Sequence, residues 1–324
     1  MCIRDSFQVE EILGYELSGE GEHIYVWLQK QNLNTAYVSE QLAKQLNIPL
    51  RNISYAGRKD KHAVTRQWFG LHVPGKIDPD FDQFCLDGAT ILKTVRHNKK
   101  LKTGNLKANL FNIVLRHVEN ADDIEQRLLD INENGVPNYF GPQRFGNNNS
   151  NLSLGQELVA GNTIRNRNKR NLAISALRSW VFNLMVSERI RKNNFNHIID
   201  GDAIMLTGSH SFFVDHGTDS TLSERLASRD ISLSSPLWGK GVLGSEREAN
   251  RFEQSIASQH PTLCQTLEGL GLEQQRRAIN LFANNMRWSQ EEDKLTLNFE
   301  LPSGCFATSV LREVINYYEP ERTL

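Results

Sequence analysis

The stretch Asn52-Ile-Ser-Tyr-Ala-Gly-Arg-Lys-Asp-Lys-His-Ala-Val-Thr-Arg-Gln-Trp-Phe-Gly-Leu-His-Val73 contains two strand patterns separated by a polar turn. Residues 52–56 favour a short strand, and this strand ends at Gly57, which permits a sharp turn. After the polar residues 58–62, residues 64–73 alternate in the manner of a half-buried strand. A connection this short favours antiparallel pairing, so the stretch predicts part of an antiparallel sheet.

Further strand and helix patterns surround this stretch, and strands outnumber helices in this half of the chain. The short connections between them again favour antiparallel neighbours, so we predict a mixed α+β arrangement. The predicted strands are residues 7–17 with 22–29, a hairpin around Gly19-Glu-Gly21, and residues 91–97 with 110–118, a pair joined by the basic loop 98–107; the predicted helices are 36–46, capped by Thr35, and 121–132.

The pattern changes near residue 135. Residues 136–151 are rich in glycine, asparagine and aromatic residues without a clear period, which is typical of a boundary loop. Helical spacing then dominates to about residue 280. The longest predicted helix is 172–192, a loop is predicted at 232–245, strands return at 287–289 and 294–301, and a last helix is predicted at 309–318.

These patterns together predict the domain organisation. We expect an α+β protein with a mainly antiparallel sheet domain, formed by residues 1–134 plus 281–324. A largely helical second domain, residues 135–280, is predicted to be inserted into it. With 324 residues the chain is long enough for two such domains.

Composition limits the function classes. No apolar stretch approaches the about 20 residues of a membrane span, and residues 1–6 lack the apolar run of a secretory signal. The histidines are dispersed, and the cysteines form no Cys-x-x-Cys pair, so we expect no metal site. Few, scattered cysteines also favour a reducing compartment, and we expect a cytoplasmic protein. The cysteines are Cys2, Cys85, Cys264 and Cys305.

Charge is segregated although the formal net charge is only −1. Three clusters of basic residues contain almost no acid, which predicts a positive surface that attracts phosphate. Taken singly, each cluster is more simply explained as a solvated face. The clusters are Lys93, Arg96, Lys99, Lys100, Lys102, Lys107 and Arg116; Arg165, Arg167, Lys169 and Arg170; and Arg51, Arg58, Lys59, Lys61 and Arg66 around Asp60.

Asp60 is the candidate for chemistry in the opening stretch. It follows the turn at Gly57 and lies between Lys59 and Lys61, whose charges favour the ionised carboxylate. An ionised carboxylate can act as a nucleophile, a base or a metal ligand. A solvated turn aspartate is the plainer interpretation of these residues taken alone.

Residues 56–65, Ala-Gly-Arg-Lys-Asp-Lys-His-Ala-Val-Thr, resemble the signature of the tRNA pseudouridine synthase D family. Five further segments resemble the same family in the same order, and together they span nearly the whole chain. The resemblance implies an enzyme that isomerises a uridine in tRNA, at position 13, to pseudouridine by base flipping, without a cofactor. The five segments are Gly19-Glu-Gly-Glu-His23, Gly104-Asn-Leu-Lys-Ala-Asn-Leu-Phe111, Val136-Pro-Asn-Tyr-Phe-Gly-Pro-Gln-Arg-Phe-Gly146, Arg167-Asn-Lys-Arg170 and Leu301-Pro-Ser-Gly-Cys-Phe-Ala-Thr308.

The resemblance also implies site residues by position. Asp60 matches the family's nucleophile, and Phe7 matches its N-terminal phenylalanine that contacts substrate. Asn109 and Phe111 match an Asn-x-Phe pair that binds substrate. Phe306 matches the aromatic residue of a Gly-x-Phe-Ala-Thr segment at the border of the pocket.

Each implied role has a physical reason and a plainer alternative. Phe111 or Phe306 can stack on an extruded base, although a strand phenylalanine is more often core. Asn109 can bond uracil or orient Asp60, or be an ordinary strand-end asparagine. Lys59 can contact phosphate, tune Asp60, or simply be solvated.

The start of the chain departs from the family pattern. Residues 1–6 resemble a cloning leftover, Ser6 stands where the family has an acidic residue, and an upstream basic residue has no counterpart. This departure bears most directly on Phe7. We expect a monomer whose partner is tRNA.

Two other function classes compete with the synthase. A non-catalytic RNA-binding protein would use the same basic clusters and aromatic residues without needing Asp60. A hydrolase that cleaves a glycosidic bond would need a second acid close to Asp60, and the adjoining sequence offers none before Asp78.

Overall fold

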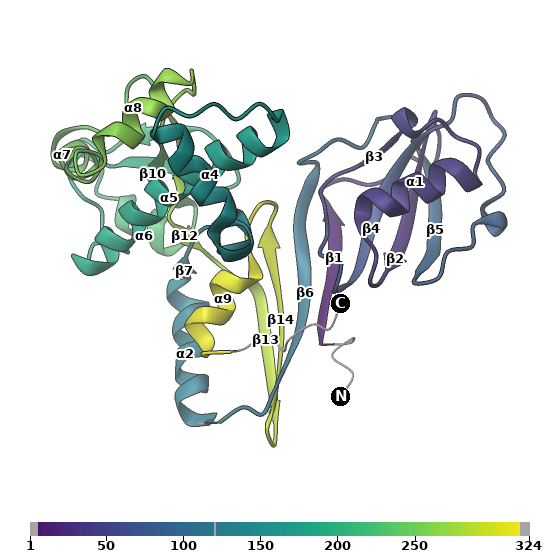
Figure 1. The fold of residues 1–324 in the computed structure, drawn as a ribbon. Helices are drawn as coiled ribbons and strands as arrows, with labels where there is room; N and C mark the ends of the chain where they lie inside the picture. The colour runs from purple at the N-terminus through teal and green to yellow at the C-terminus, as the bar shows by residue number, and fades with distance from the viewer. Residues whose placement is uncertain (1–5, 120, 318–324) are drawn as a thin grey trace. The chain divides into compact units, whose positions relative to one another are not determined.

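The computed structural model describes residues 6–119 and 121–317, and its internal contacts divide it into two compact units. The first unit comprises Met1–Gln126 with Ala283–Cys305, and the second comprises Arg127–Phe282 with Phe306–Leu324 (Figure 1). By contacts, the last helix therefore belongs to the second unit. The predicted functional division, 1–134 plus 281–324 and 135–280, stays a prediction, because compact units do not by themselves define functional domains. Residues 1–5, which carry the departure from the family start apart from Ser6, lie outside the described part.

The first unit is built on one large sheet with the strand order β13-β14-β6-β1-β4-β2-β5, and β3 pairs with β4. Its pairings are antiparallel except that of β1 with β4, which is parallel, so the predicted mainly antiparallel α+β fold is confirmed. The strands are β1 (Phe7–Leu13), β2 (His23–Lys30), β3 (Ile53–Tyr55), β4 (Val64–His72), β5 (Ala89–His97), β6 (Leu106–Arg116), β13 (Asn284–Glu291) and β14 (Lys294–Pro302).

Two predicted pairings are wrong. The first two strands form no hairpin, because β4 lies between β1 and β2. Likewise β5 pairs with β2, whereas β6 pairs with β1 and β14. Alternation of apolar residues shows which face of a strand is buried but not which strand is its neighbour. The connecting residues 14–22 and 98–105 are long enough to cross intervening strands that are spaced about 4.8 Å apart.

Helix α1 (Thr35–Gln45) covers one face of this sheet (Figure 1). Its Val38 and Leu42 are fully buried against Leu28 of β2 and Phe69 of β4. The predicted cap is wrong, because the N-cap residue is Asn34 and Thr35 is the first helical residue. The Thr35 hydroxyl instead donates to Gln67 Oε1 at 3.0 Å, which joins the start of the helix to β4.

The second unit combines helices with a small sheet. The long helix α5 packs on strand β10, and the sheet order is β11-β10-β8-β9. The predicted long helix is confirmed, whereas the loop predicted at 232–245 is wrong over its first part, which is strand β10. Ser234 and Ser235 of this strand are fully buried, so a serine-rich sequence, which favours a loop, here forms a central strand of the sheet. The elements are α2 (Ala121–Asn134), β7 (Val136–Pro137), α3 (Pro142–Phe145), α4 (Ser150–Val159), α5 (Arg167–Arg191), β8 (Ala203–Leu206), β9 (Phe212–Val214), α6 (Leu222–Ala227), β10 (Ile231–Leu237), α7 (Arg247–Ala257), α8 (Pro261–Gly269), β11 (Gln275–Ala278), β12 (Asn280–Leu281) and α9 (Ala307–Val314).

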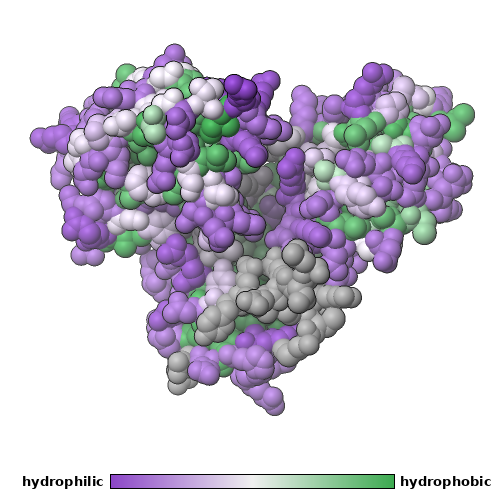
Figure 2. Space-filling model, viewed as in Figure 1, coloured by the Kyte–Doolittle hydropathy of each residue, from purple (hydrophilic) through white to green (hydrophobic). Residues whose placement is uncertain are grey.

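The surface of each unit is mainly hydrophilic on the face that Figure 2 shows, with apolar residues scattered in small groups. No helix in residues 6–119 and 121–317 is long and apolar enough to cross a membrane. Within the same residues, no group of three or more His, Cys, Asp or Glu side chains could hold a metal ion.

Candidate active site

Asp60 lies on the loop that joins β3 to β4, and its side chain is exposed. Its Oδ1 accepts a hydrogen bond from the backbone N–H of His62 at 2.9 Å, which closes a local turn. In the described part of the chain, no side chain pairs with the other carboxylate oxygen. Asp60 therefore presents an open carboxylate to an incoming molecule.

The backbone of this loop is held on both sides of the Lys59–Asp60 peptide. The N–H of Lys59 donates to Thr35 Oγ1 at 3.0 Å, and Thr35 is the first residue of α1. The carbonyl oxygen of Asp60 accepts from Lys30 Nζ at 2.8 Å, and Lys30 is the last residue of β2. An exposed side chain is thus carried on a backbone that two different elements fix in place.

The side chain of Lys59 turns inward, away from solvent. Its Nζ lies 2.8 Å from Glu11 Oε1 and donates to Asn109 Oδ1, also at 2.8 Å. Glu11 and Asn109 are directly opposed across β1 and β6, so their side chains share one face of the sheet. The Lys59 side chain is only 10% exposed, so the alternative of a solvated surface lysine is wrong.

Glu11 is a site residue that the sequence interpretation missed. Its carboxylate is fully buried, and its Oε2 accepts from the backbone N–H of Trp68 at 2.8 Å. Burial raises the pKa of Glu11, and the charge and hydrogen bond of Lys59 oppose that rise. A detectable signal existed in the sequence, because Glu11 falls two residues after the buried Val9 and so occupies an inward strand position.

Three phenylalanine rings lie on neighbouring strands of the same sheet. Phe111 stacks on Phe299 of β14, with ring centres 5.5 Å apart and planes at 24°. Phe7 of β1 meets Phe111 edge-on at 6.1 Å. Phe111 is 7% exposed, so it belongs mostly to the core, and one of its faces is already covered. Phe7 is only partly buried.

The predicted site residues therefore fall into two groups. Asp60, Lys59 and Asn109 are linked by sequence and by hydrogen bonding in the first unit, where Phe7 and Phe111 also lie. Phe306 belongs to the second unit, where its ring meets Phe140 edge-on at 6.4 Å. Its place beside the nucleophile stays a prediction.

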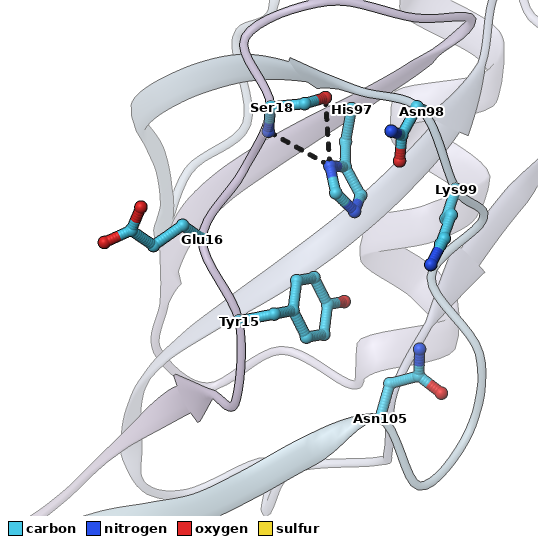
Figure 3. A pocket seen from close by; sticks show the side chains of 7 residues that line it. All are labelled: Tyr15, Glu16, Ser18, His97, Asn98, Lys99 and Asn105. Atoms are coloured by element: carbon cyan, nitrogen blue, oxygen red, sulfur yellow. Dashed lines mark hydrogen bonds between the residues drawn. The ribbon is translucent and has the colours of Figure 1, made fainter.

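A hollow of about 420 Å³ lies on the first unit beside the basic loop between β5 and β6 (Figure 3). At its wall, His97 Nδ1 accepts from the Ser18 N–H at 3.2 Å, and the Tyr15 ring stacks on the imidazole at 5.4 Å. Burial, and then the charge of Lys99, lower the pKa of His97. Because Nδ1 is an acceptor, we assign the hydrogen of the neutral ring to Nε2. The lining residues are Tyr15, Glu16, Ser18, His97, Asn98, Lys99 and Asn105.

A second hollow, of about 440 Å³, borders the same basic loop. Lys100 and Lys102 line it together with residues of β3. Neither hollow is lined by Asp60, so the cavities place basic residues beside the sheet but do not themselves form a cleft at the carboxylate. The loop that joins the two hollows is exposed at Lys99, Lys100 and Lys102, as expected for a phosphate-binding surface.

Comparison with known proteins adds to this geometry. The sequence model of the tRNA pseudouridine synthase D family matches residues 3–166 and 164–314. A tRNA pseudouridine synthase D from Pseudoalteromonas atlantica is 53% identical over 317 residues, which are 96% of this chain and 91% of that protein. The protein of the same name from Aeromonas hydrophila is 46% identical, over 97% of this chain and 90% of its own length.

The fold agrees with these sequence matches. A crystal structure from Methanosarcina mazei that carries the name tRNA pseudouridine synthase D aligns with a TM-score of 0.71 at 22% identity. The alignment covers 96% of this chain and 91% of the other. The family match and the high sequence identity to named relatives define this chain as an RNA-modifying isomerase of the pseudouridine synthase class. The chain belongs to the tRNA pseudouridine synthase D family, which confirms the resemblance seen in its motifs.

Proposed function

We propose that this protein isomerises a uridine of tRNA, at position 13, to pseudouridine, with Asp60 as the nucleophile and without a cofactor. The observation that carries the proposal is the exposed Asp60 carboxylate on a loop whose backbone is bonded to Lys30 and Thr35. Membership of the synthase family supplies the reaction class. The bonded loop holds the Asp60 backbone in one position, from which the carboxylate can attack the substrate.

The reaction is balanced without a further reactant. The N1–C1′ bond of uridine breaks, the uracil turns, and a C5–C1′ bond forms; a proton leaves C5, and N1 ends with a proton. Asp60 bonds transiently to the ribose or to the base ring and is released at the end of the cycle. Its exposure leaves the carboxylate accessible to the substrate.

The target base has to leave the RNA stack, at a cost of roughly a few kcal/mol. A stacking surface can offset about 1–3 kcal/mol of this cost per base. Phe7 is the more open of the two phenylalanines beside the nucleophile's sheet, because Phe111 is already stacked on Phe299. We therefore assign the contact with the base to the Phe7–Phe111 edge.

We assign Asn109 to the recognition of uracil. Its Oδ1 accepts from Lys59 Nζ, which orients the amide and leaves the two Nδ2 hydrogens as donors. Uracil presents carbonyl oxygens that accept such hydrogen bonds. Lys59 thus acts on the substrate through the orientation of Asn109, in place of the phosphate contact that the sequence suggested.

The exposed basic loop next to β5 and β6 supplies the contact with the tRNA backbone. Lys99, Lys100 and Lys102 have no acidic residue in the adjoining sequence. Such lysines position RNA through its phosphates without reading its sequence. The loop therefore contributes affinity, and the Asp60 region contributes chemistry.

The test is to incubate the purified chain with tRNA and to map pseudouridine chemically at each position. We expect one modified position with the unaltered chain. Asp60→Asn should abolish the product while tRNA binding is kept. The matched control is Asp87→Asn, because Asp87 is another exposed carboxylate of the first unit. Pseudouridine formed by Asp60→Asn would refute the nucleophile, and binding without product by the unaltered chain would indicate a non-catalytic RNA-binding protein.

A further inference from the structure

Lys30 is a buried lysine in contact with the candidate nucleophile's backbone. It closes β2, where it is paired with Thr65 of β4 on one side and Ala89 of β5 on the other. Its residue exposure is 0%, and its Nζ donates to the Asp60 carbonyl oxygen at 2.8 Å. A lysine side chain is almost never fully buried unless it is paired with a carboxylate.

The surroundings of this ammonium are unfavourable for a charge. Within residues 6–119 and 121–317, the hydrogen-bond acceptor of its Nζ is a neutral carbonyl, not a carboxylate. Burial lowers the pKa of Lys30 to about 8. The negative charge of Asp60 acts to raise this pKa, and the positive charge of Lys59 acts to lower it. An apolar residue of similar length would fill the same space without this desolvation cost.

We infer that Lys30 is a positioning residue of the reaction: its ammonium fixes the carbonyl of Asp60 and thereby the direction of the nucleophilic side chain. The inference rests on the proposed function of Asp60. Lys30 lies beneath the loop and acts on the substrate only through the Asp60 backbone.

The geometry explains why this bond is not redundant. Thr35 Oγ1 holds the N–H of Lys59, which precedes the nucleophile, and the His62 N–H holds one oxygen of the Asp60 side chain. Lys30 holds a third polar group of the segment, the Asp60 carbonyl. Without that bond the Asp60–Lys61 peptide can rotate, and its rotation redirects the carboxylate. Small misplacements of a reacting group lower rates by about a hundredfold.

The experiment compares Lys30→Met with the unaltered full-length chain. Steady-state kinetics with tRNA give kcat and KM, and thermal unfolding gives Tm. We expect kcat to fall about ten- to hundredfold while KM for tRNA and Tm stay the same or Tm rises. Lys44→Met, at an exposed position of α1, is the matched control and should leave all three values unchanged.

Each outcome decides the inference. An unchanged kcat in folded Lys30→Met overturns it, and so does a kcat that falls only in parallel with Tm. If Lys30→Met does not fold, Lys30→Gln is measured, because it keeps a donor in the same space; failure of both to fold assigns Lys30 a structural role and also overturns the inference. Absence of pseudouridine with the unaltered chain is a different result, which refutes the proposed function itself.

Discussion

Lys59, the residue directly before the candidate nucleophile, forms an ion pair with Glu11, and its Nζ lies 2.8 Å from Glu11 Oε1. The Glu11 side chain is fully buried and that of Lys59 nearly so. The pair joins β1 to the loop between β3 and β4, and Asn109 of β6 shares the same ammonium. The conformation of the loop is therefore determined by strands that are distant from it in the sequence.

Glu11→Gln should strongly lower the free energy of unfolding. It leaves the Lys59 ammonium buried without its carboxylate, and loss of one partner of a buried pair costs about 3–5 kcal/mol. Urea denaturation measures the change in the free energy of unfolding. The control is Glu10→Gln, since Glu10 pairs with Arg66 at the surface, where the side chains are 34% and 40% exposed. That exposed pair should contribute about 0–1 kcal/mol, and equal losses in the two variants would contradict the assignment.

Binding of tRNA should depend steeply on salt, because lysines that contact phosphate release counterions from the RNA. Lys99→Glu with Lys100→Glu should lower the slope of log affinity against log salt by about two. Fluorescence anisotropy with labelled tRNA at several salt concentrations gives the slope. Lys44→Glu with Lys76→Glu changes the total charge equally at exposed positions of the same unit. If the control pair lowers the slope equally, the salt dependence of tRNA binding is set by net charge and not by the basic loop.

Stability at alkaline pH should report the burial of Lys30. Its pKa is lowered from 10.5 to about 8 in the folded protein, so the unfolded chain binds more protons between these values. The free energy of unfolding should therefore gain a contribution from this residue as pH rises from 8 to 10.5, on the order of 3 kcal/mol. Urea denaturation at several pH values, compared with Lys30→Met, isolates the contribution. Parallel curves for the two proteins would show that Lys30 is not desolvated.

His97 should contribute in the same direction as Lys30, but in a lower pH range. Its pKa is lowered by burial and by Lys99, so the unfolded chain takes up a proton as pH falls below 6.5 while the folded protein resists it. The free energy of unfolding should decrease over that range. NMR titration of the imidazole checks both the low pKa and the Nε2–H tautomer. Lys99→Gln should raise the pKa of His97, and an Nδ1–H tautomer would contradict the hydrogen bond from Ser18.

The positions of the main elements in the first unit could be predicted from the spacing of apolar residues alone. The strand predicted at 64–73 is β4 (Val64–His72), and the helix predicted at 36–46 is α1 (Thr35–Gln45). Which strands are neighbours could not be predicted, because pairing depends on how connecting segments cross the sheet. The small sheet of the second unit escaped prediction for another reason: β10 alternates only from Ile231 to Leu233, and residues 234–236, which are serine and proline, are buried without an apolar pattern.

The candidate site shows a similar division. Asp60 and Asn109 could be selected from motifs, and the hydrogen bond between Lys59 and Asn109 agrees with that selection. Glu11 and Lys30 could not be assigned roles, because their contacts exist only once β1, β2 and β4 are in register. Both residues nevertheless occupy inward positions two residues after a buried apolar residue, and a charge at such a position indicates a buried partner.

The order of the chain has a consequence for synthesis on the ribosome. Strand β6 is made early, but its neighbour β14 pairs with it from Lys294 onward and emerges only after the whole of residues 127–282. At the usual rate of translation the outer edge of β6, with Phe111 and Ile113, waits roughly ten seconds or more for its partner. An open strand edge is a template for aggregation. Slow or faulty folding of residues 127–282 would therefore first expose the large sheet of the first unit to aggregation, because β14 is the last strand to pair with β6.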